Sequence, residues 1–261
     1  MRVFTRGGGP PLIVIPGIQG RWEWFRPALR ALSLHCRVAS YSLCGEFGCG
    51  WPLDPTLGFD NYLRQLDDVT QEVGMPAAIC GVSYGGFIAL RYAATRPERV
   101  SALLLASAPA PGWVPTGAQR AYIEHPWRAA PKFVLTSPFR MAPEIYAAFD
   151  TWRARIGFSI AQAWRVAGAP MIPGLMAARI IEQQALDFVP DAAAVRAPTL
   201  VLSGEPHLDR VVPVESTRKY VDMIPGAEYR MLERTGHVGL VTRPETFASI
   251  VAPFVKRHAG D

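Results

Sequence analysis

The chain has 261 residues, of which 49% are hydrophobic and 19% are charged, a balance typical of a folded protein and not of a disordered one. Its formal net charge of +5 comes mostly from arginines without a dense basic run, which argues against nucleic-acid binding. No apolar stretch approaches the roughly 18 residues of a membrane span, and the first residues lack the apolar core of a signal peptide. We therefore expect a cytoplasmic protein without a membrane span, as a monomer or a homodimer.

The first half of the chain alternates short apolar runs with helical patterns. The continuous apolar run at 12–15 is typical of a strand buried on both faces of a parallel sheet. Residues 61–73 repeat apolar side chains at helical spacing, and Gly74 and Pro76 end that helix. The expected elements are strands at 2–5, 12–15 and 37–43, helices at 27–34 and 61–73, and a loop rich in glycine and proline at 44–60.

Ser83 stands where a strand turns sharply into a helix. An apolar run from Ala77 ends at Gly81, and a helical pattern opens after Tyr84. Glycine is required at positions 81 and 85, because a Cβ there would collide with the neighbouring helix or strand. Such a turn strains the serine backbone and exposes its hydroxyl. We predict that Ser83 is a nucleophile, and the alternative is an ordinary serine in a glycine-rich turn.

The second half of the chain contains a long interruption of the strand pattern. Strands are expected at 103–105, 199–202 and 229–232, with helices after Pro213 and from Pro244. Strands that alternate with helices predict an α/β fold with a doubly wound, mostly parallel sheet. Residues 112–190 show no clear strand, and we predict a helical cap there, inserted into a core of residues 1–111 and 191–261. Its helices are expected to be broken by Pro126, Pro131, Pro138, Pro143, Pro170 and Pro173.

A serine nucleophile needs a base and an acid that orients the base. Among the five histidines, His237 follows a strand between Gly236 and Gly239, which allow its loop to bend across the strand ends. Asp209 follows the strand at 199–202, so the predicted triad is Ser83, Asp209 and His237, in the chain order that this turn requires. The alternatives are Glu205 as the acid, which comes very soon after the strand, and His207 as the base.

Acyl chemistry also needs hydrogen-bond donors for the oxyanion. The N–H of Tyr84, at the start of the helix, is one predicted donor. The second is expected from the loop after the strand at 12–15, where we choose the N–H of Ile18, with that of Gln19 as the alternative donor. Gln19 is also an expected substrate contact. Gly17 and Gly20 permit that loop to turn its donors inward.

The cysteines predict no metal site and leave one possible disulfide open. Cys36 and Cys80 fall in or beside expected strands and are typical of small buried side chains. Cys44 and Cys49 share a loop and could pair, but a cytosolic chain would keep them reduced. The spacing fits no zinc site, so no metal is expected.

These motifs resemble the α/β-hydrolase fold family from about residue 12 to residue 254, the cap excluded. The resemblance rests on Gly81-Val82-Ser83-Tyr84-Gly85-Gly86, on the segments 204–213 and 236–237, and on the phrase Arg96-Pro97-Glu98-Arg99-Val100. It implies an eight-stranded sheet, a serine nucleophile, a covalent acyl intermediate and no metal or organic cofactor. Two features depart from the family: Pro16 replaces its usual histidine, and the short N-terminal part leaves room for only one strand before residue 12.

We expect a serine esterase that acts on a small apolar carboxylic ester or lactone. Ser83 in place of an aspartate argues against a dehalogenase or an epoxide hydrolase. The alternatives are hydrolysis of a carbon–carbon bond next to a carbonyl, or a slow-turnover receptor that binds a ligand. All seven tryptophans fall in expected loops or in the cap, which favours either an aromatic substrate pocket or a separate cap core. The expected substrate contacts besides Gln19 are Trp22, Trp113, Trp152 and Trp164.

Overall fold

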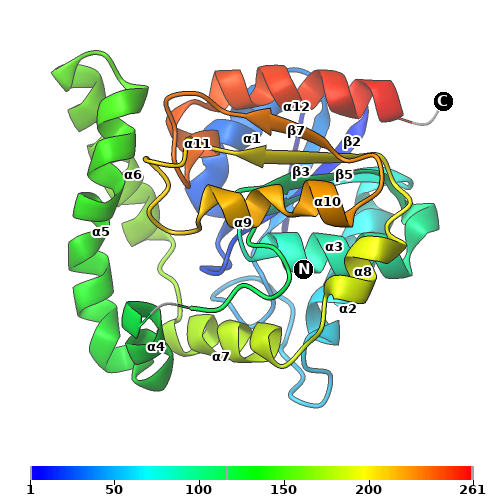
Figure 1. The fold of residues 1–261 in the computed structure, drawn as a ribbon, viewed down its shortest axis with the longest axis horizontal. Coiled ribbons are helices and arrows are strands. Elements are labelled where there is room, and N and C mark those ends of the chain that lie inside the picture. The colour runs from blue at the N-terminus through cyan, green and yellow to red at the C-terminus, as the bar shows by residue number, and fades with distance from the viewer. Residues whose placement is uncertain (1, 116, 260–261) are drawn as a thin grey trace.

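The computed structural model describes residues 2–115 and 117–259 and contains one seven-stranded sheet (Figure 1). The strand order is β1-β3-β2-β4-β5-β6-β7. Only the edge strand β1 runs antiparallel to its neighbour, and the other six strands are parallel. The strands are β1 (Val3–Arg6), β2 (Pro11–Ile15), β3 (Arg37–Tyr41), β4 (Ala77–Val82), β5 (Val100–Ala106), β6 (Thr199–Ser203) and β7 (Glu228–Met231).

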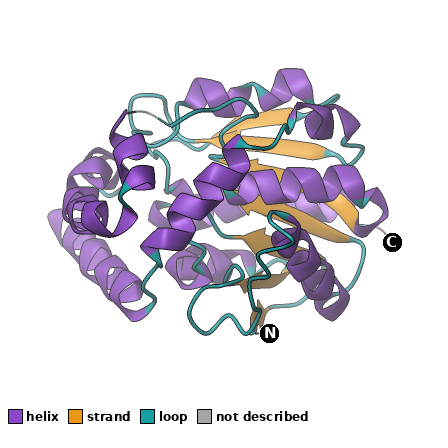
Figure 2. Ribbon diagram, turned by 90° about the horizontal axis from the view of Figure 1, so that it is seen from below, coloured by secondary structure: helices purple, strands orange, loops and turns teal. Residues whose placement is uncertain are grey.

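Helices cover both faces of this sheet (Figure 2). Alternate residues of each strand point to opposite faces, so Ile13 and Ile15 join one apolar cluster while Leu12 and Val14 join the other. The first cluster packs under α2 (Asp60–Val73), α3 (Gly85–Thr95), α8 (Val189–Ala194) and α10 (Tyr220–Met223). The second packs under α1 (Arg26–Leu32), α11 (Gly239–Thr242) and α12 (Pro244–His258). The remaining short elements of this core are α9 (Val214–Arg218) and the 3-10 turns η1 (Trp22–Phe25) and η2 (Pro97–Arg99).

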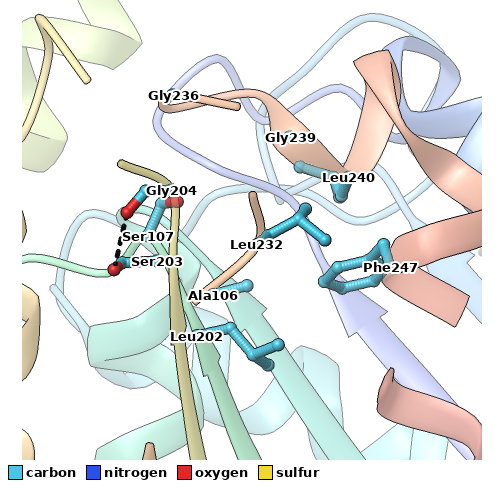
Figure 3. Close-up of a pocket in the computed structure, with 10 residues that line it drawn as sticks. All are labelled: Ala106, Ser107, Leu202, Ser203, Gly204, Leu232, Gly236, Gly239, Leu240 and Phe247. Carbon is cyan, nitrogen blue, oxygen red and sulfur yellow. Dashed lines mark hydrogen bonds between the residues drawn. The ribbon is translucent and has the colours of Figure 1, made fainter. Parts of the chain in front are cut away.

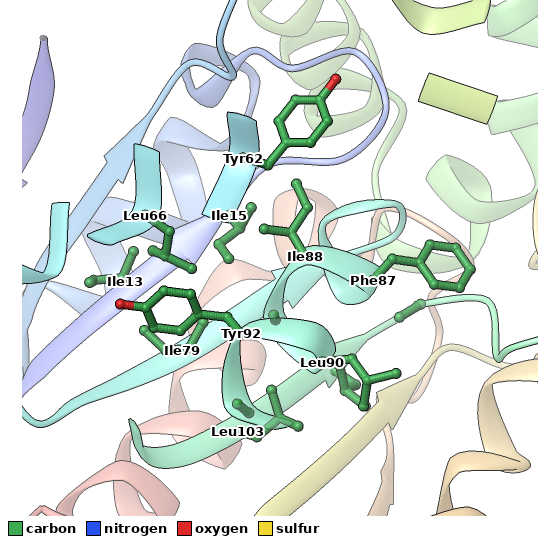
Figure 4. Packing of buried hydrophobic residues seen from close by; sticks show 14 of the residues in the cluster. Ile13, Ile15, Tyr62, Leu66, Ile79, Phe87, Ile88, Leu90, Tyr92 and Leu103 are labelled. Atoms are coloured by element: carbon green, nitrogen blue, oxygen red, sulfur yellow. The ribbon is translucent and has the colours of Figure 1, made fainter. Parts of the chain in front are cut away.

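The first cluster holds the helix that follows Ser83 firmly against the sheet. Phe87, Ile88 and Leu90 of α3 lie among Ile13, Ile79 and Leu103 of the strands (Figure 4). All six side chains are essentially inaccessible to solvent. This packing fixes the turn between β4 and α3 in place.

The predicted fold class is confirmed. The sheet is doubly wound and mostly parallel, and the element boundaries differ from the expected ones by few residues. The single strand before β2 accounts for seven strands instead of the family's eight. Between β5 and β6 the described residues contain helices and loops but no strand, and the helices are α4 (Gly117–Glu124), α5 (Pro126–Ala148), α6 (Trp152–Gly168), α7 (Pro173–Gln184) and then α8.

The expectation that prolines break this segment into short helices is wrong for three of them. Pro131, Pro138 and Pro143 lie inside the single 23-residue helix α5. A proline within a helix leaves the carbonyl four residues earlier without its donor. Pro131 and Pro138 lie on the exposed face of α5, where water can bond to those carbonyls, so the helix continues through them.

Candidate active site

Ser83 occupies a strained turn between β4 and α3. Its φ of +52° is in the left-handed region that residues other than glycine rarely adopt. The neighbouring glycines have no room for a side chain: a Cβ on Gly85 would lie 2.6 Å from the Pro16 carbonyl oxygen, and one on Gly81 would lie 2.6 Å from the Gly86 Cα. These close approaches hold the hydroxyl of Ser83 out of the sheet.

Three of the predicted side chains form a continuous chain of contacts. His237 Nε2 lies 3.1 Å from Ser83 Oγ, and His237 Nδ1 lies 3.2 Å from Asp209 Oδ2. The other carboxylate oxygen of Asp209 accepts the N–H groups of Val211 and Val212, each at 2.9 Å. The acid is therefore held on both sides, and it faces the nitrogen of His237 that points away from the serine.

Asp209 and His237 each shift the pKa of the other toward the charged form. Burial alone would raise the pKa of Asp209, but the charge and hydrogen bond of His237 and the two backbone donors lower it overall. Burial would lower the pKa of His237, yet the charge and hydrogen bond of Asp209, with a smaller contribution from Glu144, raise it overall. Asp209 therefore stays ionised and stabilises the protonated imidazole that forms when His237 accepts a proton.

The acid and histidine loops meet because glycines let their backbones touch. A Cβ on Gly204 would lie 2.8 Å from the Gly236 Cα, and one on Gly236 would lie 2.7 Å from the Leu208 carbonyl carbon. Beneath the loops, Figure 3 shows a small cavity lined by Leu202, Leu232 and other residues of the strand ends and α12. Its volume of about 10 Å³ has room for one water molecule at most, so it is not a substrate pocket.

The loop after β2 carries the predicted oxyanion donors beside the serine. A Cβ on Gly17 would lie 3.3 Å from the Ser83 Cβ, and the Gly20 N–H donates to the Gly17 carbonyl at 2.8 Å to close a tight turn. Among the described residues, the N–H groups of Ile18 and Tyr84 donate to no other protein group. Both donors therefore remain available to a substrate oxygen, and Gln19 lies half-buried in the same turn.

The alternative acid and base have other partners. Glu205 Oε1 accepts the backbone N–H of Arg234 at 2.6 Å. His207 is mostly exposed to solvent, and its ring lies 3.5 Å from the Glu205 carboxylate. Neither side chain forms a hydrogen bond or ion pair with Ser83 or His237 in the described part of the chain, which favours Asp209 and His237.

The comparisons with known proteins identify the family. A model described as "Alpha/beta hydrolase family" matches residues 3–250. This chain belongs to the alpha/beta hydrolase family. It is 27% identical over 275 residues to a poly(3-hydroxyalkanoate) depolymerase of Ectopseudomonas oleovorans, covering 99% of this chain and 89% of the relative.

Two further proteins match this chain over nearly its whole length. A pimeloyl-[acyl-carrier protein] methyl ester esterase of Aliivibrio fischeri is 25% identical over 98% of this chain and 97% of its own length. The structure of an esterase from Exiguobacterium antarcticum matches with a TM-score of 0.79 and 20% identity, covering 97% of this chain and 94% of the other. The chain is thus a hydrolase of the alpha/beta family, whose model covers residues 3–250.

The structure does not gather the predicted tryptophans of this hydrolase around the serine. Trp152 and Trp164 of α6 are 64% and 74% exposed, so their side chains face solvent and their contact with substrate stays a prediction. Trp22 stacks on Phe4 of the edge strand β1, with ring centroids 4.6 Å apart, and it packs there instead of at the triad. A tryptophan in a loop or in a helix between β5 and β6 can pack away from the serine or face solvent, and the sequence pattern does not show which.

Trp113 alone among these tryptophans lies beside a triad loop. It lines a groove of about 330 Å³ together with Val211 and Pro213, which follow Asp209 in the chain. Val114, Glu215 and Lys219 also line the groove. Ser83 lines neither this groove nor the small cavity, so the groove borders the candidate site without containing its nucleophile.

The hydrolase also carries a buried acid that the sequence analysis missed. Glu144 of α5 is 1% exposed; its two carboxylate oxygens accept the Val238 N–H at 3.2 Å and the Thr242 hydroxyl at 2.9 Å. Burial raises the pKa of Glu144, and these hydrogen bonds offset only part of that rise. The available signal was that Glu144 is the single acidic residue of a 23-residue helix.

Replacing this acid should change the pH dependence of the reaction. Glu144→Gln removes one negative charge that raises the pKa of His237, so the acidic limb of the kcat/KM profile should move to lower pH. The measurement is kcat/KM against pH for a simple ester. Glu124→Gln, on the exposed surface of α4, is the control. If the acidic limb of Glu144→Gln stays in place or moves to higher pH, the charge of Glu144 does not raise the pKa of His237.

A second missed residue, Arg179 of α7, links the loop after β2 to Glu46 in the loop after β3. Its Nη1 donates to the Ile18 carbonyl and to Glu46 Oε1, both at 2.8 Å. Both side chains of this ion pair are fully buried, and burial raises the pKa of Glu46 against the opposing charge of Arg179. Arg179 lies one turn from Met176 and Gln183 on the buried face of α7, so periodicity could have indicated its burial.

Removing this arginine should destabilise the protein strongly. Arg179→Met leaves the buried Glu46 carboxylate without its cation, which should cost about 3–5 kcal/mol of unfolding free energy. The double variant Arg179→Met/Glu46→Leu should recover part of the loss, because an apolar pair often replaces a buried ion pair at little cost. Urea denaturation measures both. If Arg179→Met and the wild type unfold at the same urea concentration, the ion pair does not stabilise this fold.

The described ranges contain no group of three or more His, Cys, Asp or Glu side chains that could hold a metal ion. The four cysteines are buried free thiols, Cys44 and Cys49 included. Among the described helices, none has the length and apolar character needed to cross a membrane.

Proposed function

We propose that this protein is a serine hydrolase that cleaves a small apolar carboxylic ester or lactone through Ser83, His237 and Asp209. The observation that carries the proposal is the unbroken contact from Ser83 Oγ through His237 to Asp209, at 3.1 and 3.2 Å, next to two free backbone donors. The esterase and depolymerase names of the relatives are compatible with such chemistry.

The acylation step follows from these positions. Ser83 Oγ attacks the carbonyl carbon of the ester while its proton passes to His237 Nε2. The carbonyl oxygen gains the negative charge and accepts hydrogen bonds from the N–H groups of Ile18 and Tyr84. When the intermediate collapses, the C–O bond to the leaving alcohol breaks and that oxygen takes the proton from His237.

Deacylation repeats the same transfers with water. His237 removes a proton from the water that attacks the acyl carbon, and the same two N–H groups stabilise the second oxyanion. The bond between the acyl carbon and Ser83 Oγ then breaks, Ser83 recovers its proton from His237, and a carboxylic acid leaves. Asp209 keeps its charge throughout and stabilises the imidazolium at both stages.

The apolar preference can be tested with aryl esters of increasing acyl length. Each buried methylene contributes about 0.8 kcal/mol, so two further carbons should raise kcat/KM roughly tenfold until the site is filled. Because Trp113 borders the acid loop and Trp164 faces solvent, Trp113→Ala should change this profile and Trp164→Ala should not. A flat profile, or equal effects of both substitutions, would contradict the preference.

Turnover and binding assays of the purified protein with esters, lactones and diketones distinguish the candidate functions. Ester or lactone turnover that depends on Ser83 supports the proposal. Turnover of a diketone with negligible ester cleavage would assign it to carbon–carbon bond hydrolysis. Tight ligand binding with negligible turnover of any of these compounds would make it a receptor.

A further inference from the structure

The outer face of α5 is apolar although it is turned to solvent. Figure 1 shows α5 along the edge of the molecule, away from the sheet. Its inner face holds the buried Glu144, and Leu135, nine residues earlier and so about 180° around the helix, is 72% exposed. The exposed stripe at spacings of three and four consists of Trp127, Pro131, Leu135, Pro138, Phe139, Ala142 and Tyr146.

Helix α6 repeats this arrangement. None of its residues is buried, and its partly covered side includes Phe158, which packs on the core. The two helices meet where the Arg155 guanidinium lies 3.6 Å from the centroid of the Tyr146 ring. The exposed stripe of α6 consists of Trp152, Ile156, Ile160, Ala163, Trp164 and Ala167. We call the two stripes together the α5–α6 outer face.

Cations surround this face and exposed anions are nearly absent. Residues 126–168 contain six basic residues and two acidic ones, of which Glu144 is buried and Asp150 is paired with Arg234. Arg128, Lys132 and Arg153 are exposed and make no ion pair within the described chain. The Arg153 guanidinium lies 5.5 Å from the centroid of the Trp152 ring, so positive charge and aromatic surface are adjacent.

We propose that the α5–α6 outer face binds the surface of an anionic lipid bilayer. Aromatic and aliphatic side chains on one side of a helix, flanked by Arg and Lys, are the composition of helices that lie in the membrane interface. The ring-and-cation pairing suits the boundary between acyl chains and anionic headgroups. A second copy of this chain fits poorly, because each copy would bring the same cations against the other.

This binding differs from a membrane span. The helices lie parallel to the surface and enter only the headgroup boundary, in agreement with the absence of a described helix able to cross a bilayer. The inner face of α5 remains on the histidine loop through Glu144, so the lipid contact is separate from the triad.

The test is co-sedimentation of the full-length protein with vesicles of phosphatidylglycerol or of phosphatidylcholine. Binding should be strong with phosphatidylglycerol, weak with phosphatidylcholine, and reduced by added salt, which screens the charges. Trp152→Ser/Trp164→Ser should weaken partitioning about tenfold or more. Arg128→Gln and Arg153→Gln should each weaken it about fivefold.

The control is Leu34→Ser, which removes a side chain that is 79% exposed in the turn after α1, outside this face. It should leave vesicle binding unchanged. All these side chains are exposed, so the variants should keep the wild-type melting temperature. Absence of wild-type binding to phosphatidylglycerol, equal binding to both lipids, or equal loss in Leu34→Ser would overturn the proposal. So would sedimentation of the free wild type as a dimer that Trp152→Ser/Trp164→Ser converts to a monomer without loss of vesicle binding.

Discussion

Ser83→Ala is expected to lower the turnover of an ester substrate by about 10⁴- to 10⁶-fold. The substitution removes the oxygen that lies 3.1 Å from His237 Nε2. Without it no acyl-enzyme can form. The remaining rate comes from binding and from the oxyanion donors alone.

The measurement combines ester turnover with covalent labelling by a serine-directed phosphonate. Ser107→Ala is a matched control, because Ser107 also directly follows a central strand and has a positive φ of +47°, yet among the described residues it forms no hydrogen bond with His237. This control should keep both labelling and turnover. Labelling that persists in Ser83→Ala would show that another residue is the nucleophile.

Asp209→Asn is expected to lower turnover by about 10⁴-fold. An asparagine at this position can donate to His237 Nδ1, which favours the wrong tautomer of the imidazole. The substitution also removes the charge that raises the pKa of His237. The acidic limb of the small remaining activity should therefore move to lower pH.

Glu205→Gln is the comparison that separates the two acid candidates. Glu205 accepts the Arg234 N–H, and an amide oxygen can still accept that bond, so turnover should change little. Steady-state kinetics of both variants against one ester decide between them. A loss in Glu205→Gln as large as that in Asp209→Asn would transfer the orienting role to Glu205.

The helix α5 lies between the histidine loop and the face that is proposed to bind lipid. Its inner face reaches the histidine loop through Glu144, and its outer face carries the apolar and cationic side chains proposed to meet lipid. The vesicle experiment and the Ser83→Ala experiment are independent, because neither readout requires the other activity. Loss of one function would leave the other proposal standing.

The sequence was sufficient for the fold and for the residues proposed as the triad, because both depend on local patterns. The carboxyl ends of parallel strands lie at one edge of the sheet. A serine after β4, an acid after β6 and a histidine after β7 are therefore brought to that edge by the strand order alone. The glycine at position 81 could likewise be interpreted from sequence, since a strand-to-helix turn this tight excludes a Cβ.

Which face of a helix between β5 and β6 packs inward was decided only by the tertiary structure. Periodicity shows which residues share a face of a helix, but it does not show which face meets the core. In α5 both faces are largely apolar, so neither the exposed stripe nor the burial of Glu144 followed from the pattern. The exposure of Trp152 and Trp164, and the partners of Arg179 on two distant loops, likewise depend on contacts between segments far apart in the chain.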